Sequence, residues 1–183
     1  MGKQFTEISG QLQQFIQQQK IFFVATATAQ SRVNLSPKGM DSLRILGPNR
    51  VVWLNVTGSG NETATHVQEN PRMTIMFTAF EGAPMILRLY GQAKVVHQHD
   101  SEWNALYALF NPLPGARQIF DLQVDLVQTS CGMAVPFFDY VEEREQLKDW
   151  AEKQGEDGIK NYWEKKNQFS IDGLPSHILD SGR

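Results

Sequence analysis

The sequence is poor in the features that mark secreted, membrane-spanning and nucleic-acid-binding proteins. A single cysteine, Cys131, excludes an internal disulfide and a metal site made of thiolates alone. No apolar run approaches the roughly 20 residues of a membrane-spanning helix, and residues 1–20 lack the apolar stretch of a signal peptide. The 17 basic residues are outnumbered by 20 acidic ones, which argues against a nucleic-acid-binding protein. We therefore expect a cytoplasmic protein with no nucleic-acid and no membrane partner.

The chain nevertheless has enough apolar residues for a sizeable core. They make up 41% of its 183 residues, which suits one folded domain rather than a disordered chain. Apolar residues recur at three- and four-residue steps between Phe5 and Ile16, which predicts an amphipathic helix with Thr6 as a candidate N-cap. We expect a single domain with an N-terminal helix at 1–20, a β core with inserted helices at 21–130 and a helical extension at 131–183.

The β core is predicted from runs of β-branched and aromatic residues that end at turn signals such as Gly47-Pro48-Asn49. Most joins between these runs are short, so antiparallel pairing is favoured, and the close spacing is typical of a barrel or a sandwich. The expected class is mainly β with peripheral helices, that is, α+β. The expected strands are 21–28, 33–36, 43–46, 51–56, 73–79, 85–96 and 119–129, and the expected inserted helices are 61–69 and 100–110.

A glycine-rich segment, Thr57-Gly58-Ser59-Gly60-Asn61-Glu62-Thr63, follows one strand and opens a helix. Unpaired amides and the partial positive charge of a helix start suit an anion such as phosphate. The segment is not a Walker loop, because no lysine follows the second glycine. The alternative is a helix capped by Asn61 after a flexible turn. Glu62 would repel a phosphate at this place unless its carboxylate points away.

Three cations are candidates for binding such an anion. Lys38 stands in Ser36-Pro37-Lys38-Gly39 at the end of a strand, and Arg44 follows on the next strand. Both cations can supply positive charge to a phosphate, and the alternative is that both are solvated on the surface. Arg88 interrupts the apolar strand 85–90. An arginine in a strand of this kind meets a carboxylate or a ligand.

The histidines and the cysteine give weaker signals. His97-Gln98-His99 would place two imidazoles on one side of a strand, where a metal ion can bind, but no third ligand follows at a recognisable spacing. We therefore expect a solvated strand end and no metal site. Cys131 lies in Ser130-Cys131-Gly132, and we expect a buried or interface thiol rather than a nucleophile.

The order of these motifs resembles the pyridoxamine 5'-phosphate oxidase-like, FMN-binding family, and most of all its oxidase-related branch. The resemblance covers residues 20–97, and the Ser130-Cys131-Gly132 and 170–175 segments are also similar to that branch. The motifs that carry it are Phe22-Phe23-Val24-Ala25-Thr26-Ala27, Asn34-Leu35-Ser36-Pro37-Lys38-Gly39, Trp53–Thr57, the Gly-Ser-Gly-Asn-Glu-Thr helix start, Glu69-Asn70-Pro71-Arg72 and Leu87-Arg88-Leu89-Tyr90-Gly91.

The resemblance implies an antiparallel split β-barrel that works as a homodimer, with two FMN molecules in clefts at the subunit interface. The implied function is an FMN-binding oxidoreductase that acts on an unidentified small molecule. One alternative is a flavin store or sensor without turnover. Others are a split barrel that binds deazaflavin or, through His97 and His99, haem, and a structural dimer with an empty cleft. The apolar run Met133–Phe138 would suit the dimer interface.

The family's flavin contacts carry over to this chain position by position. The strand that holds the phosphate and the ring edge ends at Ser36–Gly39, and a later strand that faces the flavin matches 86–88. The vitamin-making oxidase has an Arg-Lys pair where this chain has Glu62-Thr63, and its substrate-binding Arg-x-His stretch has no match in 163–179. Synthesis of pyridoxal phosphate is therefore not predicted, and no catalytic proton-transfer residue is assigned. The implied FMN-binding residues are Ser36, Pro37, Lys38, Gly39, Arg44, Thr57, Gly58, Ser59, Asn61, Glu62, Thr63 and Arg88.

Overall fold

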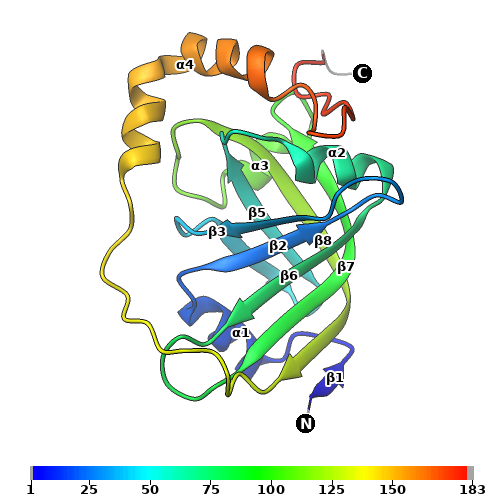
Figure 1. Cartoon of the computed structure of the whole chain (residues 1–183), viewed down its shortest axis with the longest axis vertical. Coiled ribbons are helices and arrows are strands. Elements are labelled where there is room, and N and C mark those ends of the chain that lie inside the picture. Colours follow the sequence, from blue (N-terminus) through cyan, green and yellow to red (C-terminus); the bar gives the residue numbers. More distant parts are fainter. Residues whose placement is uncertain (1, 181–183) are drawn as a thin grey trace.

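The computed structural model describes residues 2–180, and their strands form one antiparallel sheet that curls into an open barrel (Figure 1). The sheet order is β3-β2-β6-β7-β8-β5-β4, and β1 pairs with β8 off this path. The terminal strands β3 and β4 are consecutive in the chain but do not pair, so the barrel is not closed. The predicted split β-barrel is confirmed. The strands are β1 (Lys3–Phe5), β2 (Phe22–Thr26), β3 (Asn34–Lys38), β4 (Leu43–Gly47), β5 (Arg50–Val56), β6 (Arg72–Thr78), β7 (Ile86–His97) and β8 (Ala116–Ser130).

The barrel interior is filled by the apolar side chains that alternate along each strand. Phe22 and Val24 of β2 are buried while their neighbours are half-exposed, as a period of two requires. Trp53 lies at the centre, fully buried, stacked on Phe120 with 4.5 Å between ring centroids, and Phe22 meets its edge at 6.2 Å. Burial of such aromatic surface supplies much of the hydrophobic stabilisation of the barrel.

The long strand β7 bends at Gly91, where its register with β8 shifts. A Cβ atom on this glycine would lie 2.0 Å from the carbonyl oxygen of Gln123, far inside van der Waals contact. Only glycine therefore allows the two backbones to approach this closely, and the resulting bulge increases the local bend. This bend curls the centre of the sheet.

The N-terminal helix is shorter than predicted. Helix α1 spans Gly10–Gln18, and the hydroxyl of Ser9 accepts a hydrogen bond from Leu12 N at 3.4 Å, so Ser9 and not Thr6 is the N-cap. The prediction of helix from residue 1 is wrong, because Lys3–Phe5 pairs as β1 with the end of β8. Strand β5 pairs with β8 only as far as Gln123, so the backbone groups of β8 beyond Gln123 are free to pair with β1.

The remaining helices are α2 (Glu62–Glu69), α3 (Trp103–Tyr107) and α4 (Gln146–Lys166). Helix α4 is kinked at Gly155, whose φ of 64° interrupts the helix. Figure 1 shows α2, α4 and the C-terminal segment at one end of the barrel and α1 and β1 at the other. No helix in residues 2–180 has the length and apolar character needed to span a membrane.

The segment 131–145 runs along the outside of the barrel and connects its two ends (Figure 1). Met133, Phe137 and Phe138 of this segment are 82%, 80% and 60% exposed. Cys131 is also exposed, so in this chain it is not a buried thiol. The apolar run of this segment is therefore free to contact another surface.

Candidate functional site

A cleft of about 630 Å³ lies between β3, the connection from β5 to α2, and the C-terminal segment. We call it the β3–α2 cleft. It joins the two polar clusters that the sequence singled out, because the curled sheet brings its opposite ends close together. Its lining residues are Asn34, Ser36, Lys38, Asn55, Val56, Gly58, Ser59, Gly60, Asn61, Glu62, Thr63, Arg117, Lys166, Phe169, Ser170 and Ile171.

Two cations, the half-buried Lys38 and the buried Arg117, face this cleft. Burial, together with the neighbouring Arg117 charge, lowers the pKa of Lys38 to about 8. Burial likewise lowers the pKa of Arg117, which is 3% exposed, to about 10. Neither side chain forms an ion pair with a carboxylate in residues 2–180. Two like charges held together without a counter-ion are costly, and a bound anion would relieve this cost.

Several buried polar atoms around the cleft have no partner in the described part of the chain. They are Ser36 Oγ, Asn61 Oδ1 and Arg117 Nε. Arg117 is held in place by its Nη1, which donates to Gly60 O at 2.9 Å and to Asn167 Oδ1 at 2.8 Å. A guanidinium nitrogen, a hydroxyl and a lysine ammonium are donors that suit phosphate oxygens. The residues present therefore fit the phosphate group of FMN.

Helix α2 begins beside these donors. Asn61 occupies the N-cap position but its side chain makes no capping hydrogen bond. Instead its Nδ2 donates to Asn167 O at 3.1 Å. The interpretation of Asn61 as an ordinary helix cap is therefore wrong, and the first-turn amides of α2 keep their partial positive charge for another acceptor.

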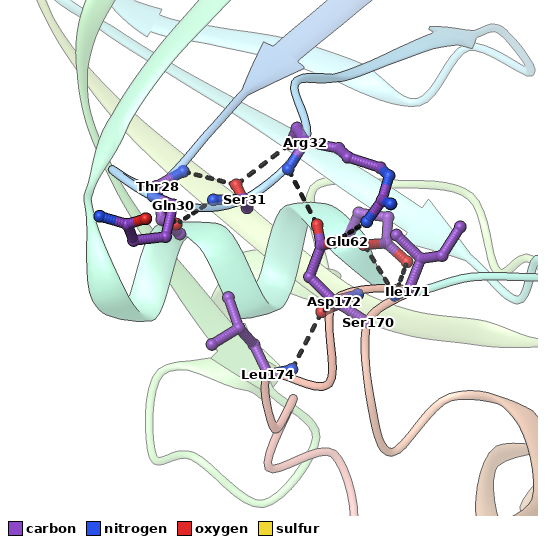
Figure 2. A network of polar contacts seen from close by, with 9 residues as sticks. All are labelled: Thr28, Gln30, Ser31, Arg32, Glu62, Ser170, Ile171, Asp172 and Leu174. Atoms are coloured by element: carbon purple, nitrogen blue, oxygen red, sulfur yellow. Dashed lines mark hydrogen bonds and ion pairs between the residues drawn. The ribbon is translucent and has the colours of Figure 1, made fainter.

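The Glu62 carboxylate, at the lining of the cleft, is held by the backbone of the C-terminal segment. Its oxygens accept hydrogen bonds from the backbone N–H of Ile171 at 3.0 and 3.2 Å (Figure 2). The carboxylate is thus directed at the Ile171 amide in the wall of the cleft.

Seven of the predicted site residues line the β3–α2 cleft. Thr57 lies behind it, 1% exposed, where its hydroxyl donates to Gly115 O and accepts from Trp163 Nε1 at 2.8 Å. Trp163 thus packs on the barrel. The seven residues in the cleft are Ser36, Lys38, Gly58, Ser59, Asn61, Glu62 and Thr63.

Pro37 and Gly39 line a second, larger cavity of about 1110 Å³ on the other side of Lys38. Segment 138–147 forms its far wall, where the Tyr140 hydroxyl lies 3.3 Å from Glu143 Oε1. Lys38 lines both spaces, so a ligand that extends beyond the β3–α2 cleft would pass this lysine.

The two predicted arginines lie outside the cleft. Arg44 pairs with Asp41 at 2.9 Å and its guanidinium lies 4.9 Å from the Phe110 ring centroid. Arg88 lies on the outer face of β7 and donates from Nη1 to Ser130 Oγ at 3.1 Å. Strands β2 and β6 separate it from β3. Within residues 2–180, Arg88 therefore meets neither a carboxylate nor the cleft.

Sequence reasoning missed Arg117. It lies at the start of β8, where the residues from Ala116 to Leu122 are all buried. The predicted strand began only at residue 119, so the arginine fell into the preceding loop. An arginine two residues before the apolar pair Ile119-Phe120 was the available signal.

Of the two histidines, His97 is buried and His99 is exposed, so the expected solvated strand end is wrong for His97 only. Their rings stack with 5.2 Å between centroids, and His97 is 5% exposed with neither ring nitrogen hydrogen-bonded. Burial, with the His99 charge as second cause, lowers the pKa of His97 to about 4. No group of three or more His, Cys, Asp or Glu side chains suited to a metal ion occurs in residues 2–180. Neither histidine lines the β3–α2 cleft.

Comparisons with known proteins agree with this fold. A relative that is 33% identical over 201 residues is the pyridoxamine 5'-phosphate oxidase family protein ustO of Aspergillus flavus, and the match covers 97% of this chain and 80% of the relative. HupZ of Group A Streptococcus superposes with a TM-score of 0.53 at 19% identity, over 65% of this chain and 91% of HupZ. HutZ, the heme storage protein from Vibrio cholerae, gives a TM-score of 0.51 at 20% identity, over 69% and 97%. The family model of pyridoxamine 5'-phosphate oxidase matches residues 8–131, and the chain therefore belongs to this family.

Proposed function

We propose that this protein binds FMN with the phosphate group in the β3–α2 cleft. The observation that carries the proposal is a pair of cations, the half-buried Lys38 and the buried Arg117, which face the cleft without a carboxylate partner in residues 2–180. Ser36 Oγ, Arg117 Nε and the first amides of α2 add donors, and Asn61 Oδ1 adds an acceptor for a ligand hydroxyl. This combination suits a phosphorylated, hydroxyl-bearing ligand.

The rest of the flavin would extend past Lys38 toward the larger cavity. That cavity shares Lys38 with the β3–α2 cleft, and its volume of about 1110 Å³ is ample for a ring system and a small substrate. A bound flavin supplies the redox chemistry, while the protein binds it, orients it and sets the charge around it. We therefore propose an FMN-dependent oxidoreductase that acts on a small molecule.

We further propose that the protein works as a homodimer. The exposed apolar side chains of Met133, Phe137 and Phe138 support this, because an apolar patch of this kind is typical of a protein interface. A dimer also gives Arg88 a role. This arginine lies away from the cleft of its own protomer, so it would reach a flavin only in the cleft of the partner subunit.

The test is an absorption spectrum of the purified protein, recorded before and after incubation with excess FMN and desalting. Retention of about one FMN per subunit supports the proposal. Loss of all added flavin overturns it, and a Soret band would instead identify haem. If flavin is retained, rapid mixing with NADH and NADPH under anaerobic conditions distinguishes an enzyme, whose flavin bleaches quickly, from a store or sensor. Retention of a deazaflavin in place of FMN would redirect the assignment within the same barrel.

A further inference from the structure

The C-terminal segment 167–176 forms the outer wall of the β3–α2 cleft. Its residues Phe169, Ser170 and Ile171 line the cleft. Phe169 and Ile171 are nevertheless 60% and 73% exposed, so these apolar side chains stand at the mouth of the cleft without a cover in the described protomer. The wall is thus placed where a ligand would have to pass.

The inner end of this wall is built into the site. Asn167 is fully buried; its Oδ1 accepts from Arg117, its Nδ2 donates to Gly58 O at 3.0 Å, and its backbone oxygen accepts from Asn61 and from Ser176 Oγ. Asn167 therefore links Gly58, Asn61 and Arg117, which all line the cleft. This end is anchored by buried hydrogen bonds, which are costly to break.

The outer end is held differently, by two carboxylates near the surface (Figure 2). The Glu62 carboxylate accepts from Ile171 N, and the Asp172 carboxylate accepts from Arg32 N at 2.9 Å and pairs with the Arg32 guanidinium. The loop itself is closed by Ser170 Oγ, which accepts from Asp172 N at 3.2 Å and Leu174 N at 3.1 Å. We call the Glu62–Ile171 and Arg32–Asp172 contacts the clasp.

We propose that the clasp closes the β3–α2 cleft over a bound phosphate-bearing ligand, and that Glu62 and Asp172 are positioning residues that control how fast the ligand leaves. The inference rests on the proposed binding of FMN. It assigns a role to Glu62, the residue that argued most strongly against phosphate binding in the sequence.

The charged side chains of the cleft and those of the clasp make separate contacts, which supports the proposal. The cations that face the cleft, Lys38 and Arg117, make no contact with the clasp carboxylates, while Asp172 engages Arg32, which does not line the cleft. Because the inner end is anchored and the outer end is exposed, the wall can open while the phosphate-binding donors of the cleft stay in place. Opening would also free the Glu62 carboxylate to turn toward the cleft, where it would repel a phosphate.

The experiment compares FMN release from wild type, Asp172→Asn and the Glu62→Gln/Asp172→Asn double variant. FMN-loaded protein is diluted, and the rise of free-flavin fluorescence gives the dissociation rate. We expect about tenfold faster release for the double variant and a smaller effect for the single one, in line with the loss of charged hydrogen bonds. The control is Glu102→Gln, which removes an exposed carboxylate that pairs with Lys94, and neither of these residues lines the cleft. It should leave the rate unchanged.

A second variant tests the opposite change, in which the wall is locked shut. Arg32→Cys/Asp172→Cys replaces the outer contact of the clasp with a reversible covalent link, and Cys131 is the only native thiol, so Cys131→Ser gives a clean background. With the link oxidised, FMN release should slow at least tenfold, and dithiothreitol should restore fast release in the same sample.

The outcomes separate the two proposals. Wild-type protein that retains no FMN overturns both. Wild-type protein that retains FMN, together with unchanged release from both the double variant and the oxidised cysteine pair, overturns the clasp alone. Hydrogen exchange at the Ile171 amide accompanies each measurement, because faster exchange in the double variant shows that the clasp has opened and that a null result on release is meaningful.

Discussion

The ammonium group of Lys38 lies over the indole ring of Trp53, with 5.2 Å between Nζ and the ring centroid. Lys38 belongs to β3 and Trp53 to β5, which stand near opposite ends of the sheet path. The contact therefore exists because the sheet curls almost into a closed barrel. A cation–π contact favours the charged lysine, while burial and Arg117 disfavour it. The charge state of Lys38 therefore depends on the balance between this contact and its burial beside Arg117.

Lys38→Met should weaken FMN binding by about 10- to 100-fold, because hydrogen bonds to charged groups contribute about 1.5–3 kcal/mol. Methionine keeps much of the apolar volume against Trp53, so the barrel should stay folded. Equilibrium dialysis with FMN measures the affinity. Lys94→Met, which removes an exposed cation that pairs with Glu102, is the control and should bind FMN as wild type does.

FMN affinity should fall as the pH rises above about 8. Burial lowers the pKa of Lys38 to about 8, so above this value binding requires uptake of a proton and the affinity should fall up to about tenfold per pH unit. The ligand-free protein should behave in the opposite way. Between about 8 and 10.5 the unfolded chain binds more protons than the folded one, so its stability should rise with pH. Affinity titrations from pH 7 to 10 check the first effect, and Lys38→Met should remove the pH dependence.

His97 should make the protein sensitive to acid. Burial lowers its pKa from 6.5 to about 4; the charges of His99 and His177 act in the same direction, and Asp100 and Asp180 oppose them. The unfolded chain therefore binds more protons between these two values, and stability should decline as the pH falls through this window, by up to about 3 kcal/mol. Urea unfolding at pH 7, 5.5 and 4.5 measures the decline. His97→Gln should reduce it, and an equal decline in that variant would contradict the assignment.

Gly91→Ala should destabilise the barrel by about 1–3 kcal/mol, because the added Cβ would overlap the Gln123 carbonyl in the adjacent strand. Gly47→Ala is the matched control, since no atom lies within 4 Å of the Cβ that it would add. Urea unfolding of both variants gives the difference. Similar midpoints for the two would show that the β7–β8 contact at Gly91 relaxes without cost.

Mixed dimers test the proposed role of Arg88 in the partner's cleft. Lys38→Ala and Arg88→Ala homodimers should each lose FMN. When the two variants are co-expressed with different tags and the mixed dimer is isolated, one cleft keeps both Lys38 and the partner's Arg88. That dimer should retain one FMN per two subunits. No retention in the mixed dimer would rule out a contribution of Arg88 across the interface.

The mixed-dimer result also depends on Lys38 being an FMN-binding residue, so FMN retention by the two homodimers is measured first. If Arg88→Ala alone retains FMN fully, Arg88 has no part in binding and acts only through its hydrogen bond to Ser130.

The amino-acid sequence by itself determined the local elements and their order. Runs of β-branched and aromatic residues that end at turn signals predicted β2, β5 and β7, Gly47-Pro48-Asn49 predicted the β4–β5 hairpin, and the glycine-rich stretch predicted the start of α2. These features depend on neighbours within a few residues, where periodicity and turn chemistry act. The motif order also identified the family, which the family model confirmed.

Only the tertiary structure decided which charges meet. Arg117 joins Lys38, and Glu62 turns to Ile171, 109 positions away in the sequence. Each of these choices depends on a partner that is distant in the sequence, or on the face of a strand that the closing sheet leaves buried. Local sequence patterns do not predict such partners, because the electrostatic environment of a side chain depends on the residues that the folded chain places beside it. The site's residue types were therefore predictable, and its charge balance was a property of the fold.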